Sequence, residues 1–348
     1  MESSAERPIL AVDLGGTQIR AALVTPDRTV HCRRATPTAD EEGVEAVIGR
    51  IIEVAAAVRS EAASEGLPEP IGVGISSPGP LDPWRGVVLL APNLAGWRNI
   101  PLVPRVAEAL GLPTFLERDT NVAVMAEWRY GAAAGTRSAI YVTVSTGIGG
   151  GIIIDGRPLI GPHGTAGEVG HMALELDGPR CGCGGIGHVE GIASGTALAR
   201  EARAILSRST DTPLSRLAAS GAEVDAALVA RAAELGDAEC MALLERAWMA
   251  VGALCATLVN LLDPEVIVIG GSIAEHHPRL FEVARRELER RAFKILLDGV
   301  RIEPAALGGD VSLIGSLPIV NDRIGDPAYA AGSQPPPSAA TQQGAPRS

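Results

Sequence analysis

The chain has 348 residues, of which 46% are hydrophobic, and this length is sufficient for two cores of ordinary domain size. A formal net charge of −11 argues against a nucleic-acid-binding protein, because such proteins neutralise phosphates with clustered basic residues. Lys294 is the only lysine, which excludes a P-loop lysine after a glycine loop. We therefore expect backbone amides, arginine or a metal ion to hold any bound phosphate.

The first half of the chain shows a pattern that occurs twice. Apolar runs at residues 9–13 and 20–24 flank a glycine turn and predict a β-hairpin. Apolar residues at helical spacing over 44–58 predict an amphipathic helix that ends near Gly66, and a strand is expected at 71–75. Strand, glycine turn and strand recur over 140–154, so we expect an internally duplicated chain.

The second half is mainly helical to residue 262, and a fully apolar strand follows at 266–269. Beyond residue 326 the composition turns to Pro, Ala, Gln and Ser, which predicts a disordered tail. The segment of eight residues before the first strand is short and polar and shows no signal or transit peptide, and we expect no apolar run that approaches the roughly 20 residues of a membrane span. We expect a cytoplasmic protein that binds neither membrane nor nucleic acid.

Three glycine-containing segments are candidates for nucleotide binding, because glycine lets several backbone amides approach one anion. Asp13, at the end of the first strand, would hold Mg²⁺ directly or through water. A single glycine turn is often only a turn, but two of them in a duplicated α/β chain indicate an actin-like ATPase fold. The candidates for ATP contact are Asp13, Gly15, Gly16, Thr17, Thr146, Gly147, Gly270, Gly271 and Ser272.

His171, Cys181, Cys183 and His188 have the spacing H-x9-C-x-C-x4-H. Four such donors predict a closed, structural zinc site; the alternatives are free thiols or a Cys181–Cys183 disulfide. If one ring nitrogen of His171 binds zinc, the other can donate to a sugar oxygen. Glu168 and Glu190, in the same stretch, are either polar groups that bracket a polyol by hydrogen bonding to adjacent hydroxyls or solvated loop carboxylates.

Asp119 follows a strand-like segment at 114–116 and precedes an alanine-rich helix. An aspartate in this position is either a helix N-cap or, in a kinase that phosphorylates a hydroxyl group, the general base that accepts the substrate proton. We take Asp119 as the candidate base.

Together these segments resemble the ROK (repressor, open reading frame, kinase) family from about Ile9 to about Leu317. The segments that carry the resemblance are Asp13–Thr17, Ser77–Pro80, Asn93–Trp97, Asp119–Asn121, Ser145–Gly150, Gly167–His171, Cys181–Glu190 and Gly270–Ser272. The resemblance implies an α/β, actin-like ATPase (ribonuclease H-like) duplicated fold with two domains and a cleft between them. We expect these domains at 1–118 and 119–325, with the end of the second allowed to pack back on the first, and the tail at 326–348.

By the same resemblance, the activity is transfer of phosphate from Mg-ATP to a hexose, glucose first, in a zinc-containing protein that is a homodimer or a larger homo-oligomer. Asp119 would be the base that acts on the sugar 6-hydroxyl. The sugar-binding residues would be Gly79, Asn93, Asp119, Glu168, His171 and Glu190.

Two positions depart from the family pattern. His188 stands where a third cysteine is usual, and it still offers a zinc ligand. Arg118 stands where many family kinases have an asparagine that contacts the sugar, and arginine cannot accept hydrogen bonds.

Three alternatives stay open or are set aside. N-acetylmannosamine, N-acetylglucosamine, mannose and fructose are other possible acceptors. A catalytically silent sugar-binding protein is the alternative of another class. A repressor with a helix-turn-helix is set aside, because eight residues precede the first strand.

Overall fold

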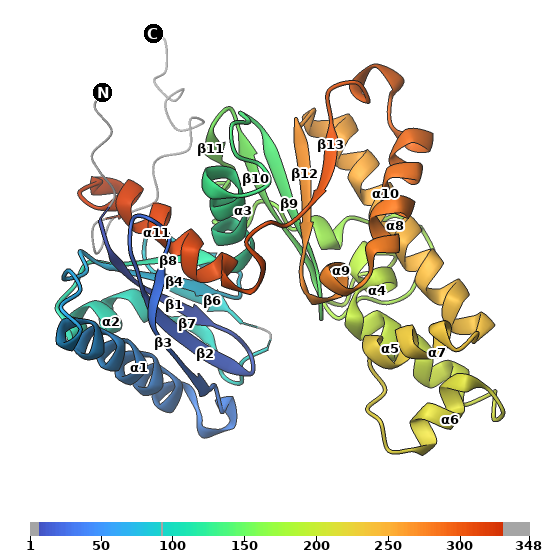
Figure 1. Cartoon of the computed structure of the whole chain (residues 1–348), viewed down its shortest axis with the longest axis horizontal. Coiled ribbons are helices and arrows are strands. Elements are labelled where there is room, and N and C mark those ends of the chain that lie inside the picture. The colour runs from blue at the N-terminus through green and yellow to red at the C-terminus, as the bar shows by residue number, and fades with distance from the viewer. Residues whose placement is uncertain (1–6, 92, 330–348) are drawn as a thin grey trace, which may run out of the picture. The chain divides into compact units, whose positions relative to one another are not determined.

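A computed structural model describes residues 7–91 and 93–329 of the chain (Figure 1). The described residues form two compact units. The first unit comprises 7–91, 93–129, 158–166 and 309–329, and the second comprises 130–157 and 167–308. This division differs from the expected one at residue 118, because the helix that starts at Asp119 groups with the first unit. The last helix also returns to the first unit.

The first unit is built on a five-stranded sheet of order β3-β2-β1-β4-β8. Its strands are β1 (Ile9–Leu14), β2 (Gln18–Val24), β3 (Val30–Pro37), β4 (Val73–Ser77) and β8 (Thr114–Arg118). The first hairpin is confirmed, with β1 antiparallel to β2, and β1, β4 and β8 run parallel. A small second sheet contains β5 (Leu81–Asp82), β6 (Val87–Leu90) and β7 (Arg98–Ile100).

Helices pack on this sheet because its residues alternate between two faces. Leu10 and Val12 of β1 lie in a core that includes Val47 and Ile51 of α1. Asp13, which follows Val12 on the opposite face of β1, and Gly74 of β4 lie on the side of α11. Arg20, the ion-pair partner of Asp13, donates to Ser312 Oγ, and a β-carbon on Gly74 would be 2.8 Å from Ser316 Cβ. The predicted first helix is confirmed, and it extends to Ser64. The helices of this unit are α1 (Val44–Ser64), α2 (Leu102–Leu110), α3 (Asp119–Tyr130) and α11 (Val311–Arg323).

The second unit repeats the strand pattern with a sheet of order β11-β10-β9-β12-β13. Its strands are β9 (Ala139–Val144), β10 (Ile148–Ile154), β11 (Arg157–Pro158), β12 (Val266–Gly270) and β13 (Arg301–Pro304). Strand β9 pairs antiparallel with β10 and parallel with β12, as β1 does with β2 and β4. The internal duplication is therefore confirmed at the level of topology.

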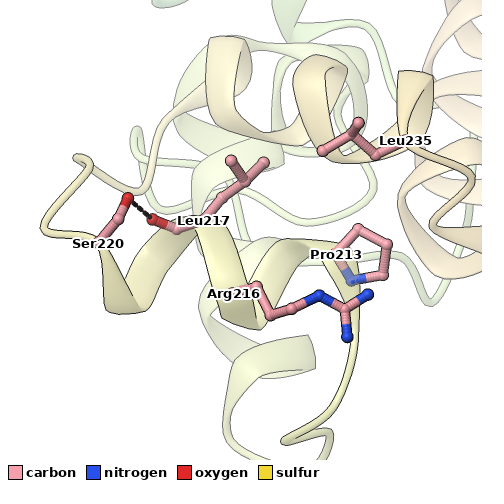
Figure 2. A pocket seen from close by; sticks show the side chains of 5 residues that line it. All are labelled: Pro213, Arg216, Leu217, Ser220 and Leu235. Carbon is pink, nitrogen blue, oxygen red and sulfur yellow. Dashed lines mark hydrogen bonds between the residues drawn. The ribbon is translucent and has the colours of Figure 1, made fainter.

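Helices make up most of the rest of the second unit (Figure 1). They are α4 (Val189–Ala193), α5 (Gly195–Leu206), α6 (Pro213–Ala219), α7 (Ala226–Glu234), α8 (Ala238–Leu262), α9 (Ser272–His276) and α10 (Pro278–Arg291). Residues of α5, α6, α7 and the start of α8 form a separate small core around Leu214 and Val229. A pocket of about 370 Å³ in this part of the unit contains no predicted site residue. Figure 2 shows the residues that line it: Pro213, Arg216, Leu217, Ser220 and Leu235.

Helix α8 corrects the expectation that no apolar run is long enough to cross a membrane. By length and composition it is apolar enough to cross a membrane, with a mean hydropathy of 1.5 over its most apolar stretch. Half of that stretch is buried within the structure, including Trp248, Val251 and Leu258. This burial is typical of a core helix, so the apolar composition of α8 is explained by packing against α4, α7 and α10.

The chain near residue 326 is also more ordered than expected. Asp326 accepts a hydrogen bond from Ala328 N at 2.9 Å, and a short 3₁₀ helix follows at Pro327–Tyr329. Tyr329 is half-buried. Residues 326–329 therefore belong to the fold, and the remainder of the predicted tail, 330–348, lies outside the described residues.

Helix α11 packs closely on α3 through Gly315. A β-carbon on Gly315 would lie 2.2 Å from the carbonyl oxygen of Val122 and 2.7 Å from Val122 Cγ1. Backbone cannot yield as a flexible side chain does, so this contact requires glycine.

Replacing Gly315 by alanine should lower the free energy of unfolding by about 1–3 kcal/mol, because the added methyl group overpacks the α3–α11 contact. Gly49→Ala in α1 is the matched control, since a β-carbon there meets nothing within 4 Å. That change should stabilise the protein by about 0.5–1 kcal/mol through better helix propensity. Urea unfolding of both variants measures the difference, and equal effects would contradict this packing.

Candidate functional site

The first glycine turn joins β1 to β2, and hydrogen bonds from Thr38 hold it in place. Gly15 N donates to Gln18 O at 3.0 Å within the turn. The fully buried Thr38 donates through its hydroxyl to Gly15 O at 2.7 Å and through its amide to Thr17 O at 2.9 Å. These bonds engage the carbonyl groups of the turn and fix its shape. Thr38 was missed in the sequence, where nothing links it to residues 15–17.

Asp13 forms an ion pair with Arg20, which lies directly opposite in the hairpin. Asp13 Oδ2 accepts from Arg20 Nη2 at 2.6 Å and from Arg20 Nε at 3.1 Å. Arg20 also donates to Ser312 Oγ and Gly309 O at 3.0 and 2.8 Å. Both bonds to Asp13 use the same oxygen, so a magnesium ion bound through Asp13 would use Oδ1 or displace the arginine. The signal for Arg20 was available in the sequence, because a turn centred on Gly16 and Thr17 pairs residue 13 with residue 20.

Asp119 stands exposed at the corner between β8 and α3, flanked by buried residues. Its Oδ1 accepts from Thr120 N at 2.7 Å, the amide of the next residue in the first turn of α3. Asp13, Ser76 and Glu117 are register partners on adjacent parallel strands, so β1, β4 and β8 end at the same edge of the sheet. The corner that carries Asp119 therefore lies at the same edge as Asp13.

Arg118 is only 3% exposed and its guanidinium is directed into the protein. It donates to Asn121 Oδ1 at 3.3 Å and to the carbonyl oxygen of Ala166. Gly79 lies against it, since a β-carbon on Gly79 would be 3.2 Å from Arg118 Cδ. The departure from the usual asparagine thus places a buried cation beside Asp119.

Asn93, the other predicted sugar ligand of the first unit, is exposed and lies against the glycine turn. A β-carbon on Gly16 would be 3.3 Å from Asn93 Cβ. The structure therefore brings Asn93 to the turn of residues 15–17, while Gly79 lies at the corner of Asp119.

In the second unit, the turn at Ser145–Gly147 and the Gly270–Ser272 segment meet. Ser145 Oγ lies 2.8 Å from Ser272 Oγ. The turn is also joined to the N-terminus of α5, where Gly195 N donates to Ser145 O at 2.8 Å and Thr196 N donates to Thr146 O at 3.2 Å. Two of the three predicted nucleotide segments are thus adjacent. Thr196 was missed, because it lies 50 residues from the turn.

Gly271 is required by this arrangement. Its φ is 95°, a conformation that side chains rarely adopt. A β-carbon there would also lie 2.7 Å from both Thr143 Oγ1 and Val144 O. The close approach of β12 to β9 explains the glycine without any ligand, and it leaves the nucleoside role of Gly270 and Gly271 a prediction.

Glu190 links the second turn to the cysteine knuckle. Its Oε2 accepts from Ile148 N at 3.0 Å, next to Gly147, and its Oε1 accepts from Cys181 Sγ at 3.2 Å. Glu190 is therefore fixed by the protein and is not merely a solvated loop carboxylate. Glu168 is exposed, and its Oε2 lies 3.9 Å from His171 Nε2, beyond hydrogen-bond distance.

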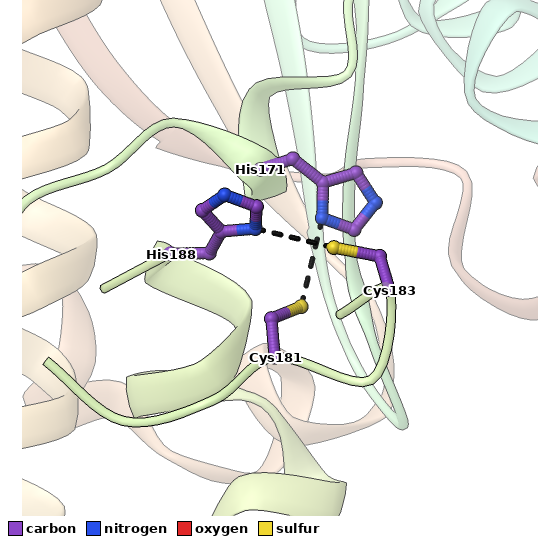
Figure 3. A group of neighbouring side chains, drawn as sticks. All are labelled: His171, Cys181, Cys183 and His188. Atoms are coloured by element: carbon purple, nitrogen blue, oxygen red, sulfur yellow. Dashed lines mark hydrogen bonds between the residues drawn. The ribbon is translucent and has the colours of Figure 1, made fainter. Parts of the chain in front are cut away.

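The four predicted metal ligands converge, as Figure 3 shows. Their donor atoms all lie within 4.8 Å of one another. His171 Nδ1 is 3.7 Å from Cys181 Sγ, and His188 Nδ1 is 3.3 Å from Cys183 Sγ. The knuckle is closed by Cys181 N donating to Gly185 O at 2.9 Å. The cysteines are free thiols, so the Cys181–Cys183 disulfide is not formed here.

These distances fit a tetrahedral zinc ion. Zn–S and Zn–N bonds of about 2.3 and 2.0 Å at tetrahedral angles separate sulfur from nitrogen by roughly 3.5 Å. The two observed separations lie on either side of that value. Burial raises the pKa of the Cys181 thiol to about 12, so a metal ion that binds here must displace a proton from its sulfur. Both histidines direct Nδ1 inward, which leaves Nε2 of His171 directed toward Glu168.

The purified protein should contain one zinc ion per chain, and Cys183→Ser should reduce this to below about one tenth, because three donors hold zinc far less tightly than four. Plasma emission spectrometry measures the metal. Cys32→Ser is the control, since Cys32 lies in another donor group with Glu61 and Glu65. If Cys32→Ser lost zinc and Cys183→Ser retained it, the metal would be bound by the group of Cys32, Glu61 and Glu65 instead.

Two sheets of equal strand order, each opening on a hairpin with a glycine turn, define a duplicated α/β fold of the actin-like ATPase type. The ROK family model matches residues 9–323, and the chain belongs to that family.

Individual relatives agree. The chain is 33% identical to a glucokinase from Thermotoga maritima, over 91% of this chain and 98% of that enzyme. It is also 33% identical to an N-acetylmannosamine kinase from Citrobacter koseri, over 76% of this chain and 83% of that enzyme. Among solved structures, a ROK family glucokinase from Streptomyces griseus in complex with glucose and AMPPNP matches with a TM-score of 0.75 and 31% identity, covering 90% and 98% of the two chains.

Proposed function

We propose that this protein is an ATP-dependent hexose kinase that phosphorylates the 6-hydroxyl of its acceptor, with glucose preferred. The observation that carries the proposal is the pair of braced glycine turns, one in each unit, together with the exposed Asp119 at the sheet edge that bears Asp13. The enzyme class is also supported by the kinase relatives, one of which is solved with glucose and an ATP analogue.

The nucleotide would be held by backbone amides, since the chain has a single lysine. The proposed contacts are the turn of residues 15–17 in the first unit, Thr146 and Gly147 in the second, and the Gly270–Ser272 segment for the nucleoside. When bound, magnesium supplies positive charge to the phosphate oxygens. Asp13 is its proposed ligand, and Arg20 holds that carboxylate in place through Oδ2. In addition, the guanidinium supplies positive charge next to the first turn.

The acceptor would be held by polar groups of both units. Asn93, against Gly16, and Gly79, against Arg118, are the proposed contacts from the first unit. Glu168, His171 and Glu190 are those from the second unit, where the knuckle fixes His171 and Glu190. A zinc ion bound to the four donors would have no open position, so its proposed role is to stabilise this loop and not to activate water.

Asp119 is the proposed general base. Its exposure makes the carboxylate accessible to a hydroxyl group, and the bond from Thr120 N orients it. It would accept the proton of the 6-hydroxyl as that oxygen attacks the γ-phosphorus.

Asp119→Asn should lower kcat by about 10²- to 10⁴-fold, because the amide keeps the shape but cannot accept the proton. The KM for ATP should change little. Asp155→Asn is the matched control: Asp155 is exposed with φ of 48°, which asparagine tolerates, and it lies in a surface turn. A coupled assay of ADP formation measures both. Unchanged turnover in Asp119→Asn would show that Asp119 is not the general base, and the role of a helix N-cap would remain.

A panel of acceptors distinguishes the candidate activities. Glucose should give the highest kcat/KM among glucose, mannose, fructose, N-acetylglucosamine and N-acetylmannosamine. An acetamido sugar is the leading alternative, because one relative is an N-acetylmannosamine kinase and because Arg118 replaces the asparagine that many family kinases have at this position. Preference for that sugar would keep the mechanism and change the substrate, whereas no ATP consumption with any sugar would favour a silent sugar-binding protein. The homodimer, the cytoplasmic location and the cleft between domains stay predictions.

A further inference from the structure

The corner that carries Asp119 is held by a buried carboxylate on the residue two before it. Glu117 is 1% exposed, and its Oε1 accepts from Arg118 N at 2.9 Å and from Asn121 Nδ2 at 2.9 Å. Arg118 and Asn121 lie on either side of Asp119 in the chain. One carboxylate oxygen therefore fixes the backbone before Asp119 and the side chain two residues after it.

The charge of Glu117 is balanced from the far end of the chain. Arg323, the last residue of α11, donates through Nη2 to Glu117 Oε2 and through Nη1 to Leu116 O at 3.1 Å. The side chains of this pair are 6% and 1% exposed. A buried carboxylate needs such a partner, because desolvation disfavours the free charge. Without Arg323, the Glu117 carboxylate would be buried with no partner for Oε2 and would shift position, and the two bonds to the corner would weaken.

Tyr329 covers the pair on its outer side. The Arg323 guanidinium carbon lies 4.4 Å from the centre of the Tyr329 ring, and Tyr329 is itself half-buried. A ring in this position contributes a cation–π interaction and excludes water from the guanidinium. The short helix Pro327–Tyr329 thus ends on a contact with the buried network.

We propose that Glu117, Arg323 and Tyr329 are positioning residues that hold Asp119 in the geometry needed to accept the substrate proton. The inference rests on the proposed function, since it assigns Asp119 as the base. None of the three residues has to contact substrate. A small displacement of a catalytic group lowers turnover strongly without changing substrate affinity, which gives the proposal a kinetic signature.

The test compares full-length variants at the two outer positions. Arg323→Lys keeps the charge but replaces the planar guanidinium, which bonds two oxygens, by a point charge. Tyr329→Ala removes the ring, and Tyr329→Phe restores it. Asp322→Asn is the matched control, because Asp322 pairs with Arg129 at 2.7 Å and joins the same two helices, α3 and α11, at the surface.

We expect kcat to fall about tenfold in Arg323→Lys and about threefold in Tyr329→Ala, with KM for both substrates within about twofold. Tyr329→Phe and Asp322→Asn should match the wild type. Equal kcat in all variants, or a loss in Asp322→Asn as large as in Arg323→Lys, would overturn the proposal.

A second readout does not depend on activity. Amide hydrogen exchange in the peptide that spans residues 114–124 should be faster in Arg323→Lys and Tyr329→Ala than in wild type, because the bond from Arg118 N to Glu117 is weakened. It should be unchanged in Tyr329→Phe and Asp322→Asn. Unchanged exchange in all four variants would show that Tyr329, Arg323 and Glu117 do not fix the corner that carries Asp119. If the wild type phosphorylates no sugar, the proposed function fails, and the exchange comparison still decides whether these residues fix the corner.

Discussion

Parallel pairing of β1, β4 and β8 is the constraint on which the candidate site of the first unit depends. Parallel strands end at the same edge of a sheet, so residues far apart in the chain become neighbours there. The first glycine turn follows β1, the segment with Gly79 follows β4, and Asp119 follows β8. The second unit applies the same constraint through β9 and β12, whose ends bring Ser145 to Ser272. Duplication of one sheet thus provides a corresponding set of loops in each unit.

Arginine carries most of the positive charge near these loops, since the chain has one lysine. Arg20, Arg118 and Arg323 each donate to more than one acceptor, which suits the planar, forked guanidinium. Their partners include carboxylates and main-chain carbonyl groups. These cations therefore serve to fix the shape of the sheet edge, and they compensate buried acidic groups in a protein that is acidic as a whole.

Local patterns in the sequence predicted what local geometry determines. The hairpins, α1 and the four metal donors follow from residue spacing, because their partners lie within a few residues or one short loop. The Glu117–Arg323 pair was not predictable in this way, since its members are 206 residues apart and each looks like an ordinary surface charge in sequence. Helix α8 shows the same limit: composition reports that a helix is apolar, but only packing shows what covers it. The division between units was expected at residue 118, although the chain crosses from one unit to the other several times.

The order of these crossings has a consequence for synthesis on the ribosome. The strands β1, β4 and β8 are translated early, but α11, which packs on β1 and β4, is among the last described elements. At about 5–20 residues per second, the 206 residues that separate Glu117 from Arg323 take roughly 10 to 40 s to make. For that time the face of the first sheet on which α11 packs lacks that helix, and the buried Glu117 lacks its partner Arg323. The nascent chain must therefore wait in a partly folded state, in which it is open to chaperone binding, until the second unit has been made.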